Sequence, residues 1–208
     1  MKKLFVLCSV LLSLNVFAEE KIQFNFPNEE ITKIIEIYSK ASNTRFVIDS
    51  TVRGKITIFN SSPLSLEEAY NQLSEALSLN GFGILKKDDY SIVRNARSIQ
   101  RDGIEVSTQL PSLRPQRMAT WIVNLKHSSA QEMKNHLGRL LNSSYGELQS
   151  LPQNNQLIIT DFTATLHRIS QMINETDVPA DPKLAKLIQQ NNSSVKKKEK
   201  TEKVETKE

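Results

Sequence analysis

Hydrophobic residues between positions 21 and 95 follow two different spacings along the chain. The stretch KIQFNF, residues 21–26, is apolar at every second position, which predicts a strand with one buried face. After Pro27 and Asn28 the spacing becomes helical, and a second helical pattern follows Ser65, a residue type that caps helices. Between the two helices, residues 45–59 (RFVIDSTVRGKITIF) hold two short apolar runs around a polar turn, which predicts a hairpin.

Two glycines mark expected turns in this part of the chain. Gly54 directly precedes the second run of the predicted hairpin, where a positive φ or a close approach of another strand would require glycine. Gly81 follows Asn80 and predicts that the second helix ends in the left-handed conformation. The runs FGILKK and YSIVRN then flank two aspartates, which predicts a closing hairpin. These elements together predict a first folded unit over residues 19–95.

A second unit is predicted over residues 119–180. The run TWIVNL indicates a strand, Ser128 or Ser129 caps a helix, and GELQSL and QLIIT indicate two further strands before a last helix. Residues 96–118 show neither spacing and carry two prolines and four arginines, which predicts a linker open to trypsin. The fold class is therefore α+β, with two small domains that each pack two helices on a mixed sheet.

The two ends of the chain differ in composition from the rest. Residues 1–18 hold two lysines, an apolar run and a cleavage-type Val-Phe-Ala, which predicts a secretory signal and a mature chain that starts at Glu19. Residues 181–208 contain few apolar residues and end in mixed lysine and glutamate, which predicts a disordered tail. The only cysteine, Cys8, lies inside the signal, so the mature chain holds no disulfide.

Catalytic and metal-binding patterns are not evident in the sequence. The three histidines fit no zinc spacing (His127, His136 and His167). Asp161 follows a strand, but its position before a helix favours a capping role. The net charge of +4 falls to about +2 without the two signal lysines, which argues against a polyanionic partner. The sequence therefore predicts no enzyme, no cofactor and no small-molecule substrate.

The order of elements in the second unit resembles the KH fold, which raises nucleic-acid binding as an alternative. KH domains hold the nucleic-acid backbone with a G-x-x-G loop, and residues 120–174 contain no such motif. Export and the small net charge argue against nucleic acid as well. No nucleic-acid partner is expected.

Residues 22–95 resemble the N0 domain of secretins, and most closely that of the type II secretion secretin. The resemblance rests on Asp49 after an apolar strand, on Val52-x-Gly54-Lys55 before the next strand, and on a helix that starts after PLSLEEA. Residues 121–179 resemble the N1 repeat, with an LIITD strand and a helix that ends before DVP. A complete secretin continues into an outer-membrane β-domain, whereas this sequence continues into a charged tail.

The resemblance implies a non-enzymatic periplasmic protein-interaction module of a type II secretion or type IV pilus-like machine. Such a module docks an inner-membrane component and assembles in rings with secretin-type subunits or its own copies, associated with the outer membrane through a secretin complex. A stand-alone accessory, half of a split secretin and a remnant remain open. An alternative is a periplasmic signalling domain that resembles the short N-terminal domain of TonB-dependent transducers, although those lack an N1 repeat directly after it.

Partner binding is expected along strand edges of the first unit. An exposed edge can accept a partner strand through main-chain hydrogen bonds. If Ile22, Phe24 and Phe26 fill the core, the residues between them point outward along the first strand, and the polar positions of KITI do the same. The expected partner-binding residues are Lys21, Gln23, Asn25, Lys55 and Thr57.

Overall fold

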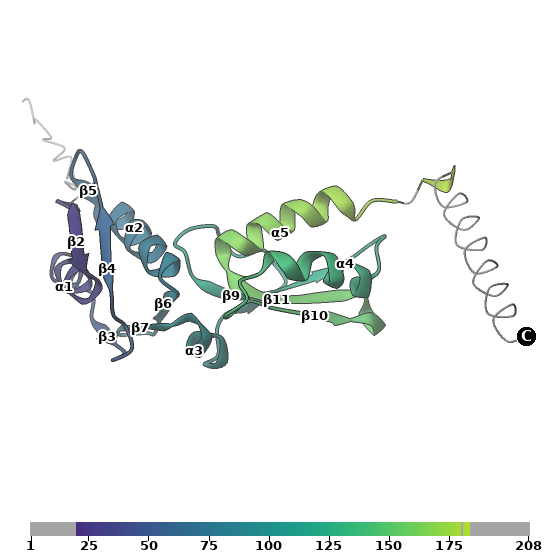
Figure 1. Ribbon diagram of the computed structural model, residues 1–208, viewed down its shortest axis with the longest axis horizontal. Helices are drawn as coiled ribbons and strands as arrows, with labels where there is room; N and C mark the ends of the chain where they lie inside the picture. The colour runs from purple at the N-terminus through teal and green to yellow at the C-terminus, as the bar shows by residue number, and fades with distance from the viewer. Residues whose placement is uncertain (1–19, 180, 184–208) are drawn as a thin grey trace, which may run out of the picture.

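A computed structural model describes residues 20–179 and 181–183 of the chain. The molecule is elongated, with the elements from β2 to β7 at one end and those from β9 to α5 at the other (Figure 1). The α+β class is confirmed, as two units each pack helices against a mixed sheet. The expected signal and nearly all of the expected tail lie outside the described residues.

Two amphipathic helices pack in the core of the first unit. Helix α1 spans Ile31–Ser42 and helix α2 spans Leu66–Leu79, and both bury one apolar face in a common core. Ser65 begins α2 as predicted: its hydroxyl accepts from the N–H of Glu68 at 3.2 Å, while the Glu68 carboxylate accepts from the N–H of Ser65 at 3.0 Å. Gly81 ends the helix with a φ of 76°, which confirms the left-handed turn.

The strands of the first unit form three small sheets. The main sheet has the order β3-β7-β6, in which β3 runs parallel and β6 antiparallel to β7. The closing hairpin β6–β7 is confirmed. Two antiparallel pairs, β1–β5 and β2–β4, complete the unit. The strand bounds are Lys21–Ile22 for β1, Phe26–Glu30 for β2, Phe46–Ile48 for β3, Lys55–Ile58 for β4, Leu64–Ser65 for β5, Phe82–Lys86 for β6 and Ser91–Asn95 for β7.

The predicted hairpin over residues 45–59 is wrong. Strand β3 pairs with β7 and strand β4 pairs with β2, so the segment between them crosses from one sheet to another. An Asp49 side chain that accepts from the N–H of Thr51 at 2.9 Å turns the chain at the start of this crossing. At its end Gly54 has a φ of 123°, and its carbonyl accepts from the N–H of Ile31 at 3.0 Å. The expected positive φ at Gly54 is therefore confirmed.

The predicted single strand over KIQFNF is also wrong. Strand β1 ends at Ile22, and β2 begins at Phe26 and continues through a bulge at Asn28, where φ is 53°. Phe24 and Phe26 are both buried, with their ring centroids 4.9 Å apart, and the side-chain amide of Asn60 donates to the carbonyl of Phe24. The burial alternation that the sequence pattern suggested persists, with Gln23 and Asn25 exposed, but the main-chain ladder is interrupted between Ile22 and Phe26.

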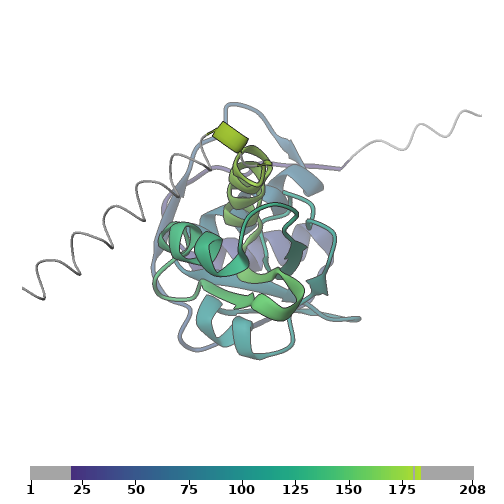
Figure 2. The ribbon, with the colours of Figure 1, turned by 90° about the vertical axis from the view of Figure 1, so that its right-hand side faces the viewer.

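The second unit is a four-stranded mixed sheet with two helices on one face, which Figure 2 shows end-on. The predicted order of strand, helix, strand, strand, helix is confirmed, and a short strand β8 adds at one edge, parallel to β9. The sheet order is β10-β11-β9-β8. The bounds are Val106–Ser107 for β8, Met118–Asn124 for β9, Ala130–Leu137 for α4, Glu147–Leu151 for β10, Gln156–Phe162 for β11 and Thr163–Thr176 for α5.

Side chains distant in sequence accept hydrogen bonds from the main-chain N–H groups at the start of α4 and in the loop before it. Neither candidate serine caps it by its hydroxyl; instead the side-chain oxygen of Asn155 accepts from the N–H of Ala130 at 2.8 Å. In the preceding loop, the carboxylate of Asp177 accepts three main-chain N–H bonds at 2.7–2.8 Å, from residues 126–128. Burial acts to raise the pKa of Asp177, but these N–H donors outweigh it and hold that pKa below its usual value.

The expected linker over residues 96–118 is folded. It contains helix α3 (Ala96–Arg101) and strand β8, and its apolar residues form a third core with the edge of the second unit. Members of this core are Ala96, Ile99, Ile104, Met118 and Phe162. Helix α3 is short, and the buried residues of the third core are spread over several elements. No window of the sequence therefore shows a hydrophobic period. Among the described residues, no helix is long and apolar enough to cross a membrane.

We predict that Gly54→Ala lowers the free energy of unfolding by about 1–3 kcal/mol, because the backbone must keep a φ that disfavours any side chain. Urea denaturation measures the effect. Gly138→Ala is the matched control: Gly138 has a φ of −57°, and the nearest heavy atom to an added Cβ lies 4.0 Å away. A loss of stability equal at the two sites would contradict backbone strain at Gly54.

We predict that native trypsin digestion leaves the bonds after Arg97 and Arg101 intact, because both residues belong to α3 and the Arg97 guanidinium donates to the carbonyl of Ser144 at 2.8 Å. Mass spectrometry of a digestion time course measures this, and digestion in urea supplies the control in which both bonds are cut. Early release of two fragments divided near residue 100 would show that α3 is not held in the third core.

Candidate partner-binding surfaces

The outer edge of strand β4 is open for strand pairing. The register matches Glu30 to Lys55 and Glu29 to Ile56. The bond from the Ile31 N–H to the Gly54 carbonyl, one position beyond the ladder, indicates which of these pairs is hydrogen bonded. Main-chain groups alternate sides along a strand, so those of Ile56 face β2, whereas those of Lys55 face away. Within residues 20–179, β4 pairs with β2 alone.

Three exposed side chains accompany this edge, two on the solvent face of β4 and one directly after its last residue. Lys55 and Thr57 are exposed as predicted, and Phe59 continues the same alternation with 73% of its surface accessible. Ile56 and Ile58 point the other way and pack against the first core. Phe59 was not among the residues expected to face outward, because it ends the apolar run KITIF. Its alternation with the two polar positions was the signal that could have found it.

Thr57 also supports the paired strand β2. Its hydroxyl accepts from the N–H of Asn28 at 3.0 Å, at the bulge where β2 departs from regular pairing. The bulge therefore has a partner for a main-chain donor that the ladder leaves unpaired. The main-chain groups of Thr57 face the outer edge by the same alternation as those of Lys55.

The other three predicted residues do not lie together on one edge strand. Lys21 belongs to β1 and pairs with Ser65 of β5, whereas Gln23 and Asn25 are exposed but lie between β1 and β2. The expectation that these residues line one strand is wrong, because that strand is interrupted at Phe24. The structure therefore favours β4 over the N-terminal stretch as an edge for pairing.

A second candidate surface is the face of the second sheet opposite its helices. Ile158 of β11 pairs with Ile122 of β9, and two residues further along the same face the buried hydroxyls of Thr120 and Thr160 are hydrogen bonded at 2.8 Å. The isoleucines are half-buried rather than covered by a helix. Strand β10 lies at the edge of the same sheet. This surface offers a flat, partly apolar face and a free strand edge for packing against another protein.

The polar groups of the second unit have structural partners. Asp161 is buried, and burial raises the pKa of its carboxyl, which accepts from the N–H of Asn142 at 2.9 Å and of Phe162 at 2.7 Å. Gly146 packs against this carboxyl so closely that a Cβ would lie 2.6 Å from an oxygen. Asp161 therefore organises the turn at 142–146. The prediction that it caps α5 is wrong, because the N-cap residue of that helix is Phe162.

The described residues hold no group of three or more His, Cys, Asp or Glu side chains arranged to bind a metal. His127 and His136 are exposed, and a ring nitrogen of His167 lies 2.7 Å from the carbonyl of Pro111. The histidines are dispersed over the second unit rather than gathered at one site.

Comparisons with known proteins identify both units. Residues 24–93 match the family model "GspD-like, N0 domain", and residues 120–182 match the model "Bacterial type II/III secretion system short domain". The chain thus has the tandem small domains of a secretin N-terminus. More particularly, its two domains are those of the N-terminal part of type II secretins, an N0 domain followed by an N1-type domain, which confirms the resemblance seen in the sequence.

The curated relatives are secretins much longer than this chain. Secretin XcpQ of Pseudomonas aeruginosa is 30% identical over 154 residues, which is 74% of this chain and 22% of XcpQ. Secretin GspD of Vibrio cholerae is 23% identical over 195 residues, which is 93% of this chain and 29% of GspD. The chain therefore spans less than a third of the length of these relatives.

A solved structure supports the fold. The Klebsiella pneumoniae type II secretion outer membrane complex, which contains PulD, PulS and the PulC HR domain, matches with a TM-score of 0.65 at 22% identity. The match covers 74% of this chain and 26% of the matched chain. The match of the second unit to a secretin short domain favours the secretin family over the signalling domain of transducers.

We predict that Phe59→Ala changes the free energy of unfolding by less than about 0.5 kcal/mol, because the ring is exposed and supports no core. Phe26→Ala is the matched control, since that ring is 7% exposed and its removal costs about 3–5 kcal/mol. Urea denaturation of both variants measures the difference. Equal losses would show that Phe59 packs against the protein and is not free to bind.

Proposed function

We propose that this protein is a non-enzymatic periplasmic interaction module of a type II secretion machine. Its first domain docks an inner-membrane component through the edge of β4, and its second domain packs against secretin-type subunits. The observation that carries the proposal is an open strand edge with three outward side chains on a domain of the N0 family. Strand addition to such an edge gives affinity through main-chain bonds and specificity through alternate side chains.

The chemistry of the β4 edge suits a protein partner. Phe59 supplies an exposed aromatic ring, the kind of side chain that anchors interfaces, and Lys55 supplies a positive charge at the opposite end of the strand. The solved Klebsiella complex contains a secretin together with the PulC HR domain, which supports an HR-type domain as the candidate occupant. The signal-like residues 1–18 support a periplasmic location.

The second unit supplies the contact with other subunits. Its family match is to a short domain of secretion systems, and its open sheet face and β10 edge are available for packing. A flat face on one copy that meets a different face on the next copy generates a ring when the rotation closes. We assign ring packing to this unit and inner-membrane docking to the first unit.

We predict that Thr57→Pro abolishes binding of the PulC-type HR domain from the same organism, measured by isothermal titration calorimetry. Proline removes the N–H on the outer edge and the hydroxyl bond to Asn28 but leaves the main-chain bonds from β4 to β2 intact, so the domain remains folded by circular dichroism. Thr57→Val is the matched control, because it loses the hydroxyl bond to Asn28 as proline does but keeps the N–H.

The valine variant should weaken binding by less than about 1 kcal/mol. Phe59→Ala provides a second arm that tests the aromatic anchor without a change to the main chain. Undiminished binding by a folded Thr57→Pro protein would refute strand addition at β4. Gln23→Pro, at the exposed stretch between β1 and β2, then tests the N-terminal surface as the alternative docking site.

A further inference from the structure

Gln116 is a buried polar residue between the two units, with 6% of its surface exposed. On the side of the first unit it contacts α2 twice. Its main-chain N–H donates to the hydroxyl of Ser74 at 3.2 Å, and its side-chain nitrogen Nε2 donates to Glu75 Oε2 at 3.3 Å. A glutamine in the segment expected to be a linker is therefore attached to the face of a helix about 40 residues earlier.

The same side chain contacts the start of α5 in the second unit. Its oxygen Oε1 accepts from the Thr163 hydroxyl at 2.6 Å and from the N–H of Ala164 at 3.0 Å. Helix α5 has no cap from its own N-cap residue, Phe162, so Gln116 supplies a partner for a helix donor that would otherwise lack one. The carbonyl of Arg117 accepts from the N–H of Thr163 at 3.0 Å and continues the attachment.

Apolar packing surrounds this polar contact. Gly83 of β6 approaches the third core so closely that a Cβ would lie 2.8 Å from Ile99 Cδ1 and 3.5 Å from the ring of Phe162. Helix α3 is attached to the second unit by a bond from Gln100 to Glu147 at 2.7 Å. The two units therefore meet through packed side chains and are not joined by a loop alone.

We propose that Gln116, with Ser74, Glu75, Thr163 and Ala164, forms a joint that fixes the orientation of α5 relative to α2, so that the two units move as one body. A primary amide has both donors and an acceptor, and only one relative position of the helices satisfies both sides. Rotation of one unit would leave buried polar groups unpaired. If the function proposed above holds, a partner bound at β4 sets the direction of the ring-packing face through this joint.

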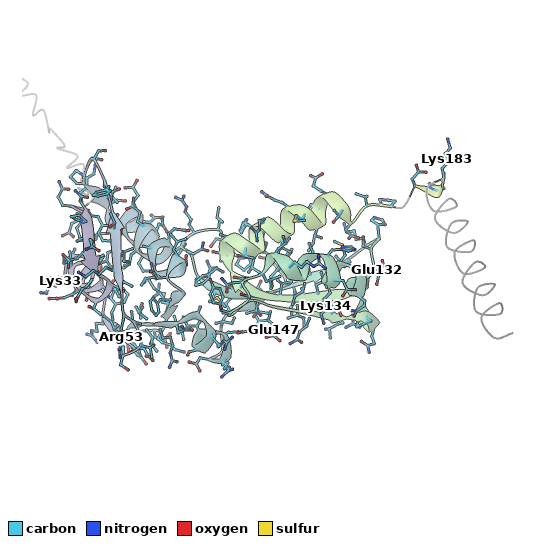
Figure 3. All side chains as sticks on the ribbon, viewed as in Figure 1. Lys33, Arg53, Glu132, Lys134, Glu147 and Lys183 are labelled. Carbon is cyan, nitrogen blue, oxygen red and sulfur yellow. The ribbon has the colours of Figure 1, made fainter. Side chains whose placement is uncertain are left out.

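The joint is tested by distances between spin labels on the two units of the mature full chain. Lys33→Cys in α1 and Glu132→Cys in α4 place the labels near opposite ends of the molecule (Figure 3). The only natural cysteine, Cys8, lies in the expected signal, so no other thiol reacts. Double electron–electron resonance should show a single narrow distance distribution for this protein, as one body requires.

Gln116→Glu should broaden the single narrow distribution of label-to-label distances. The substitution keeps an oxygen for Thr163 and Ala164 but removes the donor to Glu75 and opposes two carboxylates. Adding Glu75→Gln restores a donor on the other side of the same contact, so the doubly substituted protein should recover the narrow distribution. A merely structural loss at either position would not be rescued by the second substitution.

Two results would overturn the joint: a broad distribution in the protein with an unaltered joint, or a narrow one that Gln116→Glu does not change. Circular dichroism of each variant shows that both units remain folded. The label distances require no partner and are therefore independent of docking at β4. If the HR domain fails to bind the unsubstituted protein, the proposed function is wrong while the distances still decide the joint.

Discussion

The side-chain amide of Gln116 is satisfied on both sides only when helices α2 and α5 take one relative position. Apolar contacts such as those of the third core have little directional preference and would tolerate sliding of one sheet past the other. A buried amide with partners on two helices does not. Gln116 belongs to neither surface, yet it sets how the docking edge and the ring-packing face are oriented relative to each other.

Local patterns in the sequence were sufficient to predict most elements. The helices α1 and α2 repeat apolar residues over several turns, and the Ser65–Glu68 capping box lies within four residues, so both signals fit in one window. Pairing of strands β3 and β4 was not predictable in this way, because each selects a partner far along the chain. Helix α3 is too short to show a period, and its burial depends on Phe162 from the other unit.

The candidate site was predicted in part for the same reason. Lys55 and Thr57 alternate with half-buried isoleucines, and simple alternation placed them correctly on the exposed face. Gln23 and Asn25 follow the same rule in the sequence, yet the side chain of Asn60 binds the carbonyl of Phe24 and no regular ladder forms there. A tertiary contact over 36 residues interrupts the ladder although side-chain burial keeps its two-residue period, and no local signal announces this contact.

The three N–H bonds to Asp177 attach the end of α5 to the loop before α4, and Figure 1 places this point far from β4 along the long axis of the molecule. The chain beyond this carboxylate consequently departs from a fixed exit, remote from the edge where a partner strand would pair. Sequence added at that exit, whether a fused domain or an affinity tag, would extend the molecule without crowding the docking edge. The first domain can thus be presented to a binding partner while the protein is held by its other end.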